Sequence, residues 1–171
     1  MPIETFENQT PRVHPRALVH PTAHLIGDVD IGEETYVLPM VVMRGDSGAI
    51  RIGARTSIQD GSVLHATTGV STTSVGAKCT VGHRVILHGC KVGNLCLVGM
   101  GSVVMDNAEL GDSCFLAAGS LVPPGKVYPP RSFILGSPAR RQRDITETEQ
   151  QVMELSWQSY VALLHRYRAG F

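Results

Sequence analysis

The sequence has few aromatic residues, no excess of charge and no long apolar run, and each shortage excludes a class of protein. Only 5% of the 171 residues are Phe, Trp or Tyr, so large flat side chains do not build the core. The 15 Lys and Arg residues balance 15 Asp and Glu residues, which argues against a general binder of nucleic acid or anionic membranes. No stretch of about 18 apolar residues occurs, so we expect no transmembrane helix.

Two further absences concern the cysteines and the N-terminal segment. The four cysteines include no Cys-x-x-Cys pair, so we expect neither a zinc knuckle nor a disulfide framework. Residues 1–13 show no basic segment followed by an apolar one, so we expect no secretory signal. The predicted location is therefore cytoplasmic.

Aliphatic residues recur every six positions along most of the chain. In four series separated by changes of register, they are Val19, Leu25, Ile31, Val37 and Met43, then Ile52, Ile58 and Leu64, then Val75, Val81 and Leu87, and finally Val92, Val98, Val104, Leu110, Leu116 and Val122. A small or β-branched residue lies four positions after nearly every one. A period of six fits neither an α-helix nor an alternating hairpin, and it is typical of a parallel β-helix built from hexapeptides.

The predicted fold is therefore mainly β, a parallel β-helix of hexapeptide repeats with a C-terminal α-helix. Three hexads make one triangular coil, and neighbouring coils stack their strands about 4.8 Å apart. The aliphatic and small residues point inward, and the residue after each aliphatic points outward. The repeats cover about 19–127, and we expect the paired prolines at 123–124 and 129–130 to interrupt the strands.

We expect two parts, a β-helix domain over 1–140 and a tail over 141–171. The tail becomes helical from Asp144, where Thr146 and Glu149 can form a capping box at the start of the helix. This helix is expected to pack on the outside of the β-helix or against a neighbouring subunit.

Three cysteines share one inward column of the predicted coils. Cys79, Cys96 and Cys114 occupy the small position on one face, and Thr35 and Thr56 belong to the same column. We interpret these thiols as core filling, because a free cysteine packs as a small hydrophobe.

Face counting also brings histidines together. Positions three apart in the aliphatic series share a face, so Arg44, His65 and His88 stack one above another and point outward. Two histidines one strand apart suit two ligands of one metal ion, and a three-fold oligomer would bring His83 of a neighbour to the same ion. Three histidines and an open position form the ligand set of catalytic zinc, which lowers the pKa of its bound water to about 7. The alternative is that all three are ordinary surface residues.

The same region resembles the γ-class carbonic anhydrase family, within the hexapeptide-repeat superfamily. The matching segments are Arg44-Gly45-Asp46, Ser57-Ile58-Gln59-Asp60-Gly61, His65, Val81-Gly82-His83, Leu87-His88-Gly89-Cys90, Val98-Gly99-Met100-Gly101 and Gly136-Ser137-Pro138-Ala139-Arg140. Together they cover most of the chain between His20 and Arg140.

The resemblance implies a left-handed β-helix that assembles as a homotrimer. It implies a metal ion, Zn²⁺ or alternatively Fe²⁺ or Co²⁺, held by His65 and His88 of one subunit and His83 of the next. The implied reaction is the reversible hydration of CO₂ to bicarbonate by a metal-bound hydroxide, as in a carbonate dehydratase lyase. Neither nucleic acid nor membrane is an implied partner.

The resemblance also implies roles for five other side chains. Gln59 matches a polar residue near the metal-bound water. Arg44 and Asp46 match residues that form ionic contacts at the subunit interface, and Asp60 matches a partner of that arginine. Tyr160 matches a tyrosine that the C-terminal helix of some relatives places near the site.

Two departures from the family pattern reduce the expected hydratase activity. Ser57 stands where the family has asparagine, which alters one polar contact near the site. The loop over residues 66–74 contains no carboxylate, whereas fast CO₂ hydration needs an acidic group to export protons.

Two other functions fit the sequence. Many hexapeptide-repeat proteins are coenzyme A (CoA)-dependent acyltransferases, which need one histidine base rather than three ligands, and a thioesterase is a related possibility. The third hypothesis is a non-catalytic, metal-binding scaffold trimer. A CO₂ hydration assay would separate this scaffold from the hydratase.

Overall fold

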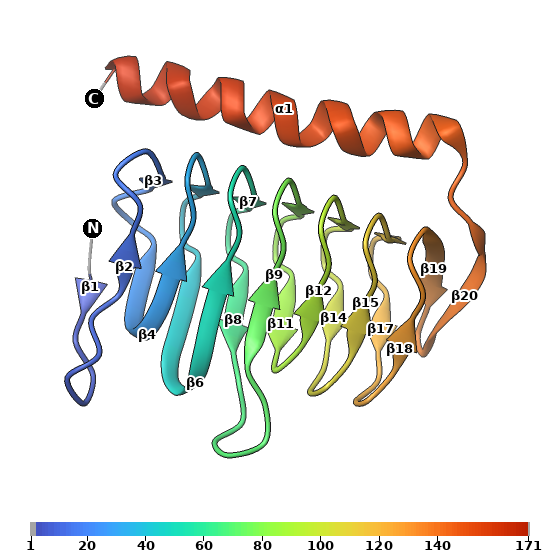
Figure 1. The fold of residues 1–171 in the computed structure, drawn as a ribbon, viewed down its shortest axis with the longest axis horizontal. Helices are drawn as coiled ribbons and strands as arrows, with labels where there is room; N and C mark the ends of the chain where they lie inside the picture. The colour runs from blue at the N-terminus through green and yellow to red at the C-terminus, as the bar shows by residue number, and fades with distance from the viewer. Residues whose placement is uncertain (1–2, 171) are drawn as a thin grey trace.

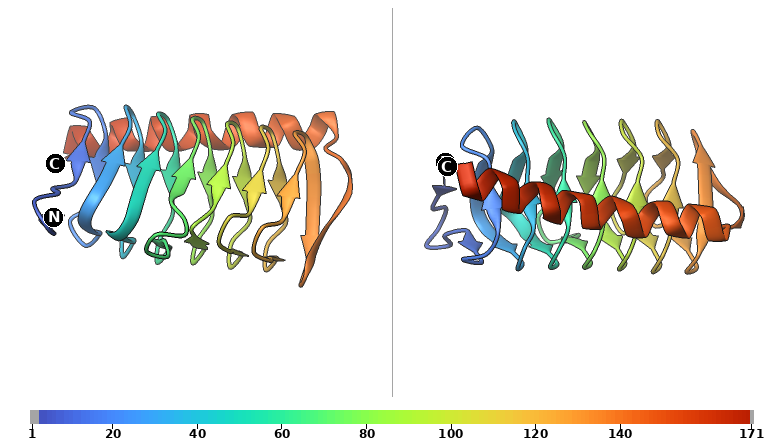
Figure 2. Two further views of the ribbon diagram at one scale, coloured as in Figure 1. Left: turned by 60° about the horizontal axis from the view of Figure 1, so that its bottom comes forward. Right: turned by 90° about the horizontal axis from the view of Figure 1, so that it is seen from above.

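A computed structural model describes residues 3–170 and shows a β-helix with one long α-helix along its side (Figure 1; Figure 2). The chain winds in stacked coils from the N-terminal end of the molecule to the other end. It then turns back, and the helix runs the length of the coils (Figure 2). The predicted architecture is confirmed.

Most strands are short, because each side of a coil holds only part of one hexad. The strands are β1 (Ile3–Glu4), β2 (Arg12–Val13), β3 (Leu18–Val19), β4 (His24–Ile31), β5 (Tyr36–Val37), β6 (Val42–Ile52), β7 (Ser57–Ile58), β8 (Val63–His65), β9 (Thr73–Val75), β10 (Thr80–Val81), β11 (Ile86–His88), β12 (Lys91–Val92), β13 (Leu97–Val98), β14 (Val103–Val104), β15 (Glu109–Leu110), β16 (Phe115–Leu116), β17 (Leu121–Val122), β18 (Val127–Tyr128), β19 (Ser132–Gly136) and β20 (Ala139–Asp144). The helix is α1 (Glu147–Gly170).

The strands stack in parallel on three faces. The site face carries β8, β11, β14 and β17, and the charged face carries β9, β12, β15 and β18. The long strands β4 and β6 turn the corner between these two faces, which joins them into one sheet. The helix face carries β3, β5, β7, β10, β13, β16 and β19 in a second sheet.

The register predicted from the hexads is confirmed. Leu64 pairs with Leu87 between β8 and β11, and Ile58 pairs with Val81 between β7 and β10. All four side chains are fully buried, as are nearly all the other inward aliphatics. The burial of these stacked side chains removes apolar surface from water and stabilises each coil against the next.

The predicted cysteine column is also present. The Cys96 backbone N–H lies 3.4 Å from Cys79 Sγ, and the Cys79 N–H donates to Thr56 Oγ1 at 3.0 Å. Cys79, Cys96 and Cys114 are buried and free, in agreement with their interpretation as core filling.

The prolines do not end the stack, so that expectation is wrong. β18 pairs in parallel with β15, and β19 pairs with β16, which extends the coils to Gly136. The paired prolines flank these strands rather than interrupt them, so no ladder hydrogen bond is lost. β20 then pairs antiparallel with β19 and spans the predicted boundary at residue 140. The division into 1–140 and 141–171 stays a prediction.

Helix α1 packs on the helix face of its own chain. Its capping box is present: Glu149 N–H donates to Thr146 Oγ1 at 3.2 Å, and Thr146 N–H donates to Glu149 Oε2 at 2.7 Å. Leu164 is fully buried against Tyr36 and Leu38. Within residues 3–170, no helix is long and apolar enough to cross a membrane.

Candidate functional site

Two histidines end neighbouring strands of the site face and contact each other. His65 ends β8 and His88 ends β11, and the two residues are register partners. His65 Nδ1 lies 3.2 Å from His88 Nε2, and the rings meet edge to face with centroids 5.2 Å apart. The predicted stacking of these side chains is confirmed, and we call them the histidine pair.

A carboxylate holds the outer nitrogen of each ring. His65 Nε2 lies 3.0 Å from Asp46 Oδ1, and His88 Nδ1 lies 3.1 Å from Asp106 Oδ2. A carboxylate accepts hydrogen bonds, so both outer nitrogens carry N–H groups. The two inner nitrogens therefore face each other as lone pairs when both rings are neutral, and together they can accept one proton.

Both carboxylates are kept ionised. Ser71 Oγ donates to Asp106 at 2.5 Å, and this hydrogen bond with that of His88 lowers the pKa of Asp106. Partial burial opposes ionisation of Asp46, but His65 and Arg44, whose Nη1 lies 2.7 Å away, outweigh it and lower the pKa of Asp46. The pair is thus flanked by two negative charges, those of Asp46 and Asp106.

A glycine leaves room for the contact between Ser71 and Asp106. Gly89 follows His88 and has φ of +64°, the left-handed region that suits glycine. A Cβ atom at this position would lie 2.1 Å from both Asp106 Oδ1 and Ser71 Oγ. The turn after β11 therefore needs glycine for both conformation and space.

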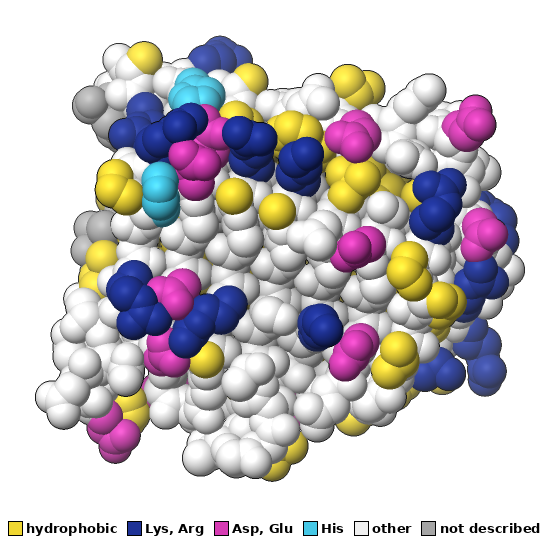
Figure 3. All heavy atoms as spheres, viewed as in Figure 1, with side chains coloured by type: hydrophobic (Ala, Val, Ile, Leu, Met, Phe, Trp, Pro, Cys, Tyr) yellow, Lys and Arg dark blue, Asp and Glu magenta, His cyan; other side chains and the backbone are white. Residues whose placement is uncertain are grey.

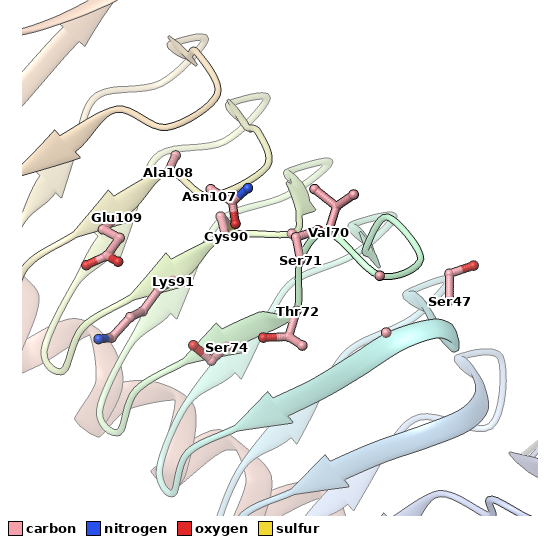
Figure 4. Close-up of a pocket in the computed structure, with 13 residues that line it drawn as sticks. Ser47, Val70, Ser71, Thr72, Ser74, Cys90, Lys91, Asn107, Ala108 and Glu109 are labelled. Atoms are coloured by element: carbon pink, nitrogen blue, oxygen red, sulfur yellow. The ribbon is translucent and has the colours of Figure 1, made fainter.

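A pocket of about 550 Å³ lies where the loop over residues 66–72 leaves the coils, and Gly89, the residue after His88, is part of its lining (Figure 4). Ser71, Cys90 and Asn107 converge on it, while Lys91 and Glu109 line it from neighbouring strands of the charged face. We call it the loop pocket. Burial raises the pKa of the Cys90 thiol to about 12, so this group is not a nucleophile at neutral pH.

The other predicted site residues form a second cluster at the next corner. His83 Nδ1 lies 2.9 Å from Asp60 Oδ2, and both side chains are almost half exposed. Gln59 interacts with Tyr160 of α1, which brings the helix to this corner. We call these four residues the second cluster.

The structure separates the predicted residues into these two groups. Arg44, Asp46, His65 and His88 lie together on the site face, whereas His83 bonds to Asp60 at a different corner. Within the chain, Arg44 pairs with Asp46 and not with Asp60.

Sequence reasoning missed Asp106 and Ser71. A signal for Asp106 was present, because it lies 18 residues after His88, which is one coil of three hexads. Ser71 lies in the loop that departs from the repeat, so no periodic signal marks it.

Comparisons with known proteins give relatives over nearly the whole chain. No family model matches. The chain is 41% identical over 170 residues to the carnitine operon protein CaiE of Proteus, an alignment that covers 99% of this chain and 86% of the relative.

Solved structures agree with this relationship. A hexapeptide transferase family protein from Anaplasma phagocytophilum superimposes with a TM-score of 0.93 and 37% identity, over 97% of this chain and 98% of the other. A perosamine N-acetyltransferase from Caulobacter crescentus, in complex with CoA and GDP-perosamine, has a TM-score of 0.58 and 26% identity, over 78% of this chain and 57% of the other. The neighbours support the predicted left-handed β-helix of hexapeptide repeats.

These findings correct the expected chemistry. The predictions of a metal-dependent carbonate dehydratase and of a Zn²⁺, Fe²⁺ or Co²⁺ cofactor are wrong, because the relatives are CaiE and hexapeptide transferases and a neighbour binds CoA. Among residues 3–170, no group of three or more His, Cys, Asp or Glu side chains could hold a metal ion. CO₂ is likewise not supported as the substrate.

Proposed function

Because the chain belongs to the hexapeptide-repeat family that includes the carnitine operon protein CaiE, we propose that it transfers an acyl group from a CoA thioester, with the histidine pair as general base. The observation that carries this proposal is the pair itself. Its inner nitrogens face each other, its outer nitrogens are fixed by carboxylates, and Gly89, the residue after His88, lines the loop pocket.

The proposed reaction begins with the acceptor. The inner nitrogens of His65 and His88 take the proton from an acceptor hydroxyl or amine. Asp46 and Asp106 stabilise the positive charge that this proton brings to the pair. A base held at a fixed position in this way contributes about 100- to 10,000-fold to the rate of proton transfer reactions.

The acyl step then uses the same proton. The acceptor oxygen or nitrogen attacks the thioester carbonyl carbon and forms a new bond to it. The bond from this carbon to sulfur breaks, and the leaving CoA thiolate takes the proton from the histidine pair. The products are the acylated acceptor and CoA with a free thiol, and the pair returns to its starting state.

We propose that the protein acts as a homotrimer. The support is an apolar row on the site face, formed by the outward residues that precede the buried aliphatics. Its members are Val42, Val63, Ile86, Val103 and Leu121. Val63 and Ile86 are 38% and 41% exposed within one chain, and α1 covers a different face. A second copy of the chain would bury this row.

In the trimer, the second cluster of one subunit would face the histidine pair of the next. His83 is 46% exposed and available for such a contact. We propose that His83 and Gln59 orient the acceptor, while Asp60 and Tyr160 hold them in place. Arg44 would keep Asp46 ionised and in position. The cytoplasmic location stays a prediction.

The release of free thiol from acetyl-CoA tests the proposed reaction. The assay uses a panel of small amines and alcohols as acceptors, together with a reaction that contains no acceptor. Wild-type protein should release thiol faster than the uncatalysed background with at least one acceptor. His65→Gln should lower this rate about 100- to 10,000-fold, because the pair loses one of its two basic rings.

A matched control is available in the same β-helix. His20 lies on a different coil from the histidine pair, and its Nδ1 is 2.9 Å from Thr22 Oγ1. His20→Gln should leave the rate unchanged. The proposal fails if wild-type protein gives only the background rate with every acceptor. It also fails if His65→Gln releases thiol as fast as His20→Gln does.

A further inference from the structure

The loop between β8 and β9 interrupts the hexad series next to the histidine pair. It spans residues 66–72, from the end of β8 at His65 to the start of β9 at Thr73, and it projects from the coils (Figure 1). Figure 3 shows no charged side chain on this projection, in agreement with its sequence of alanine, glycine, valine, serine and threonine. The polar side chains that this loop can offer to the pair are therefore hydroxyl groups.

One of these hydroxyls holds the carboxylate that faces His88. Ser71 Oγ donates to Asp106 Oδ1 at 2.5 Å, and His88 Nδ1 lies 3.1 Å from the other oxygen, Oδ2. The Ser71 oxygen accepts the Thr67 N–H at 3.1 Å, which directs its own proton toward Asp106. Both carboxylate oxygens are thus occupied, so Asp106 cannot turn away from His88 without losing a hydrogen bond.

The same arrangement surrounds His65. Asp46 Oδ1 lies 3.0 Å from His65 Nε2, and Arg44 Nη1 donates to the other oxygen at 2.7 Å. Each carboxylate therefore binds an imidazole through one oxygen and an orienting donor through the other. Ser71 is the orienting donor on one side of the pair and Arg44 on the other.

A second hydroxyl anchors the end of the loop. Thr73 is fully buried. Its Oγ1 donates to the His65 carbonyl oxygen at 2.5 Å and accepts the Gly89 N–H at 2.8 Å. It therefore joins the ends of the two strands that carry the histidines. Because Thr73 lies two residues after Ser71, this anchor also restrains the position of the Ser71 hydroxyl.

The orientation of Asp106 decides which nitrogen of His88 carries the proton. When Asp106 accepts from Nδ1, the Nε2 atom is a lone pair directed toward His65 Nδ1, 3.2 Å away. If Asp106 turns away, His88 can take the other tautomer and donate from Nε2 to His65. That hydrogen bond occupies both inner nitrogens, and neither can then accept a proton from an acceptor.

We propose that this loop positions the histidine pair, with Ser71 selecting the tautomer of His88 through Asp106 and Thr73 anchoring the loop. The proposal rests on the proposed function, because a base needs the inner nitrogens as lone pairs. Ser71 is a positioning residue, since it acts through Asp106 and takes no proton in the reaction.

NMR of protein labelled with ¹⁵N in histidine tests the tautomers without any need for catalysis. At a pH where both rings are neutral, wild-type protein should show the His88 proton on Nδ1 and the His65 proton on Nε2. Ser71→Ala should raise the ratio of the Nε2–H to the Nδ1–H form of His88 about 10-fold, because Asp106 loses one hydrogen bond. Ser71→Thr keeps the hydroxyl and should keep the wild-type ratio.

Thr73→Val and Thr56→Val form a matched pair of variants. Thr56 Oγ1 donates to the Gly76 carbonyl oxygen at 2.8 Å and accepts the Cys79 N–H at 3.0 Å, which are the same two kinds of contact at another corner of the coils. Both variants should lose similar amounts of stability. Only Thr73→Val should raise the tautomer ratio of His88.

The proposal is overturned if wild-type His88 carries its proton mainly on Nε2. It is also overturned if Ser71→Ala or Thr73→Val changes the tautomer ratio no more than Thr56→Val does. An equal change in Ser71→Ala and Ser71→Thr would contradict it as well, because the hydroxyl would then not be the cause.

Kinetics distinguish this proposal from the proposed reaction. Ser71→Ala should lower kcat for thiol release from acetyl-CoA about 10-fold, and Ser71→Thr should restore it. If the tautomers respond as expected but no acceptor promotes thiol release by wild-type protein, the positioning role stands and acyl transfer is wrong. If wild-type protein releases thiol and Ser71→Ala changes neither kcat nor the tautomers, acyl transfer stands and the positioning role is wrong.

Discussion

Two corners of the β-helix each hold a histidine paired with an aspartate, but they differ in how their side chains converge. On the site face, His65 and His88 lie on adjacent strands, and their side chains are 18% and 33% exposed. At the second cluster, His83 stands alone and is 46% exposed. Histidines at the ends of strands that stack in register therefore contact each other. A histidine in a turn, such as His83, has no such neighbour and can face a partner subunit.

The two corners also depend on different parts of the chain. The histidine pair and its carboxylates come entirely from the coils and their turns. The second cluster includes Tyr160, so it depends on where α1 docks. A change in α1 should therefore disturb the second cluster and leave the pair in place.

The largest expected effect comes from the histidine pair. His88→Gln should lower acetyl-CoA thiol release about 100- to 10,000-fold, because the remaining ring loses its partner and Asp106 loses its link to the proton. Circular dichroism should show an intact β-helix. If the rate of His88→Gln lies within about threefold of wild type, the histidine pair is not the base and the two corners do not differ in this way.

The next effect concerns stability. Leu164→Ala should lower the free energy of unfolding by about 2–5 kcal/mol, because Leu164 is fully buried against Tyr36 and Leu38. Leu155→Ala on the same helix is the control, since Leu155 is 65% exposed. Urea denaturation measures the loss, and hydrogen exchange should show α1 opening before β11. Equal exchange in both elements would mean that the pair also depends on the helix.

A smaller effect is expected at the second cluster. His83→Gln should lower kcat/KM about 10-fold, because the acceptor loses one contact. Co-expression of His83→Gln and His88→Gln chains should yield mixed trimers in which some sites combine an intact pair with an intact His83. Their activity should exceed that of either parent. Activity equal to the average of the parents would place each site within one chain.

The smallest effect concerns the start of α1. Hydrogen bonds from Arg143 and from Thr146 hold the pKa of Glu149 down to about 2. A lowered folded pKa contributes stability that is present above pH 4.5 and is lost as the pH falls toward 2. Glu149→Gln should cost about 1 kcal/mol at pH 7, and its difference from wild type should shrink as the pH falls through this range.

Urea denaturation at several pH values measures this difference. Glu147→Gln is the matched control, because Glu147 lies in the same first turn and has no part in the capping box. The role given to Glu149 is contradicted if Glu147→Gln changes the pH dependence of stability as much as Glu149→Gln does.

The coils could be predicted because a hexad repeat fixes which residues stack. The register of Leu64 with Leu87 predicts from the sequence alone that His65 lies beside His88. The same spacing also marks Asp106, but a single carboxylate one coil after a histidine carries little weight without its contact. Ser71 was beyond prediction, because its loop leaves the repeat and no local rule fixes its conformation.

The chemistry could not be predicted from the same residues. Two stacked histidines suit a shared metal ion and a shared proton equally well, so the pattern did not decide between them. The matching segments mark corners and stacked strands, so they predict the coils and not the reaction. The docking of α1 depends on Tyr36, Leu38 and Leu164, which the hexad pattern does not relate to each other.

A crystal structure with an unreactive thioether analogue of acetyl-CoA tests the central claim most directly. The account predicts the acyl group in the loop pocket, with a bound acceptor or water within about 3.5 Å of the inner nitrogens of His65 and His88. An acyl group bound out of reach of both rings would contradict the claim that the histidine pair is the base.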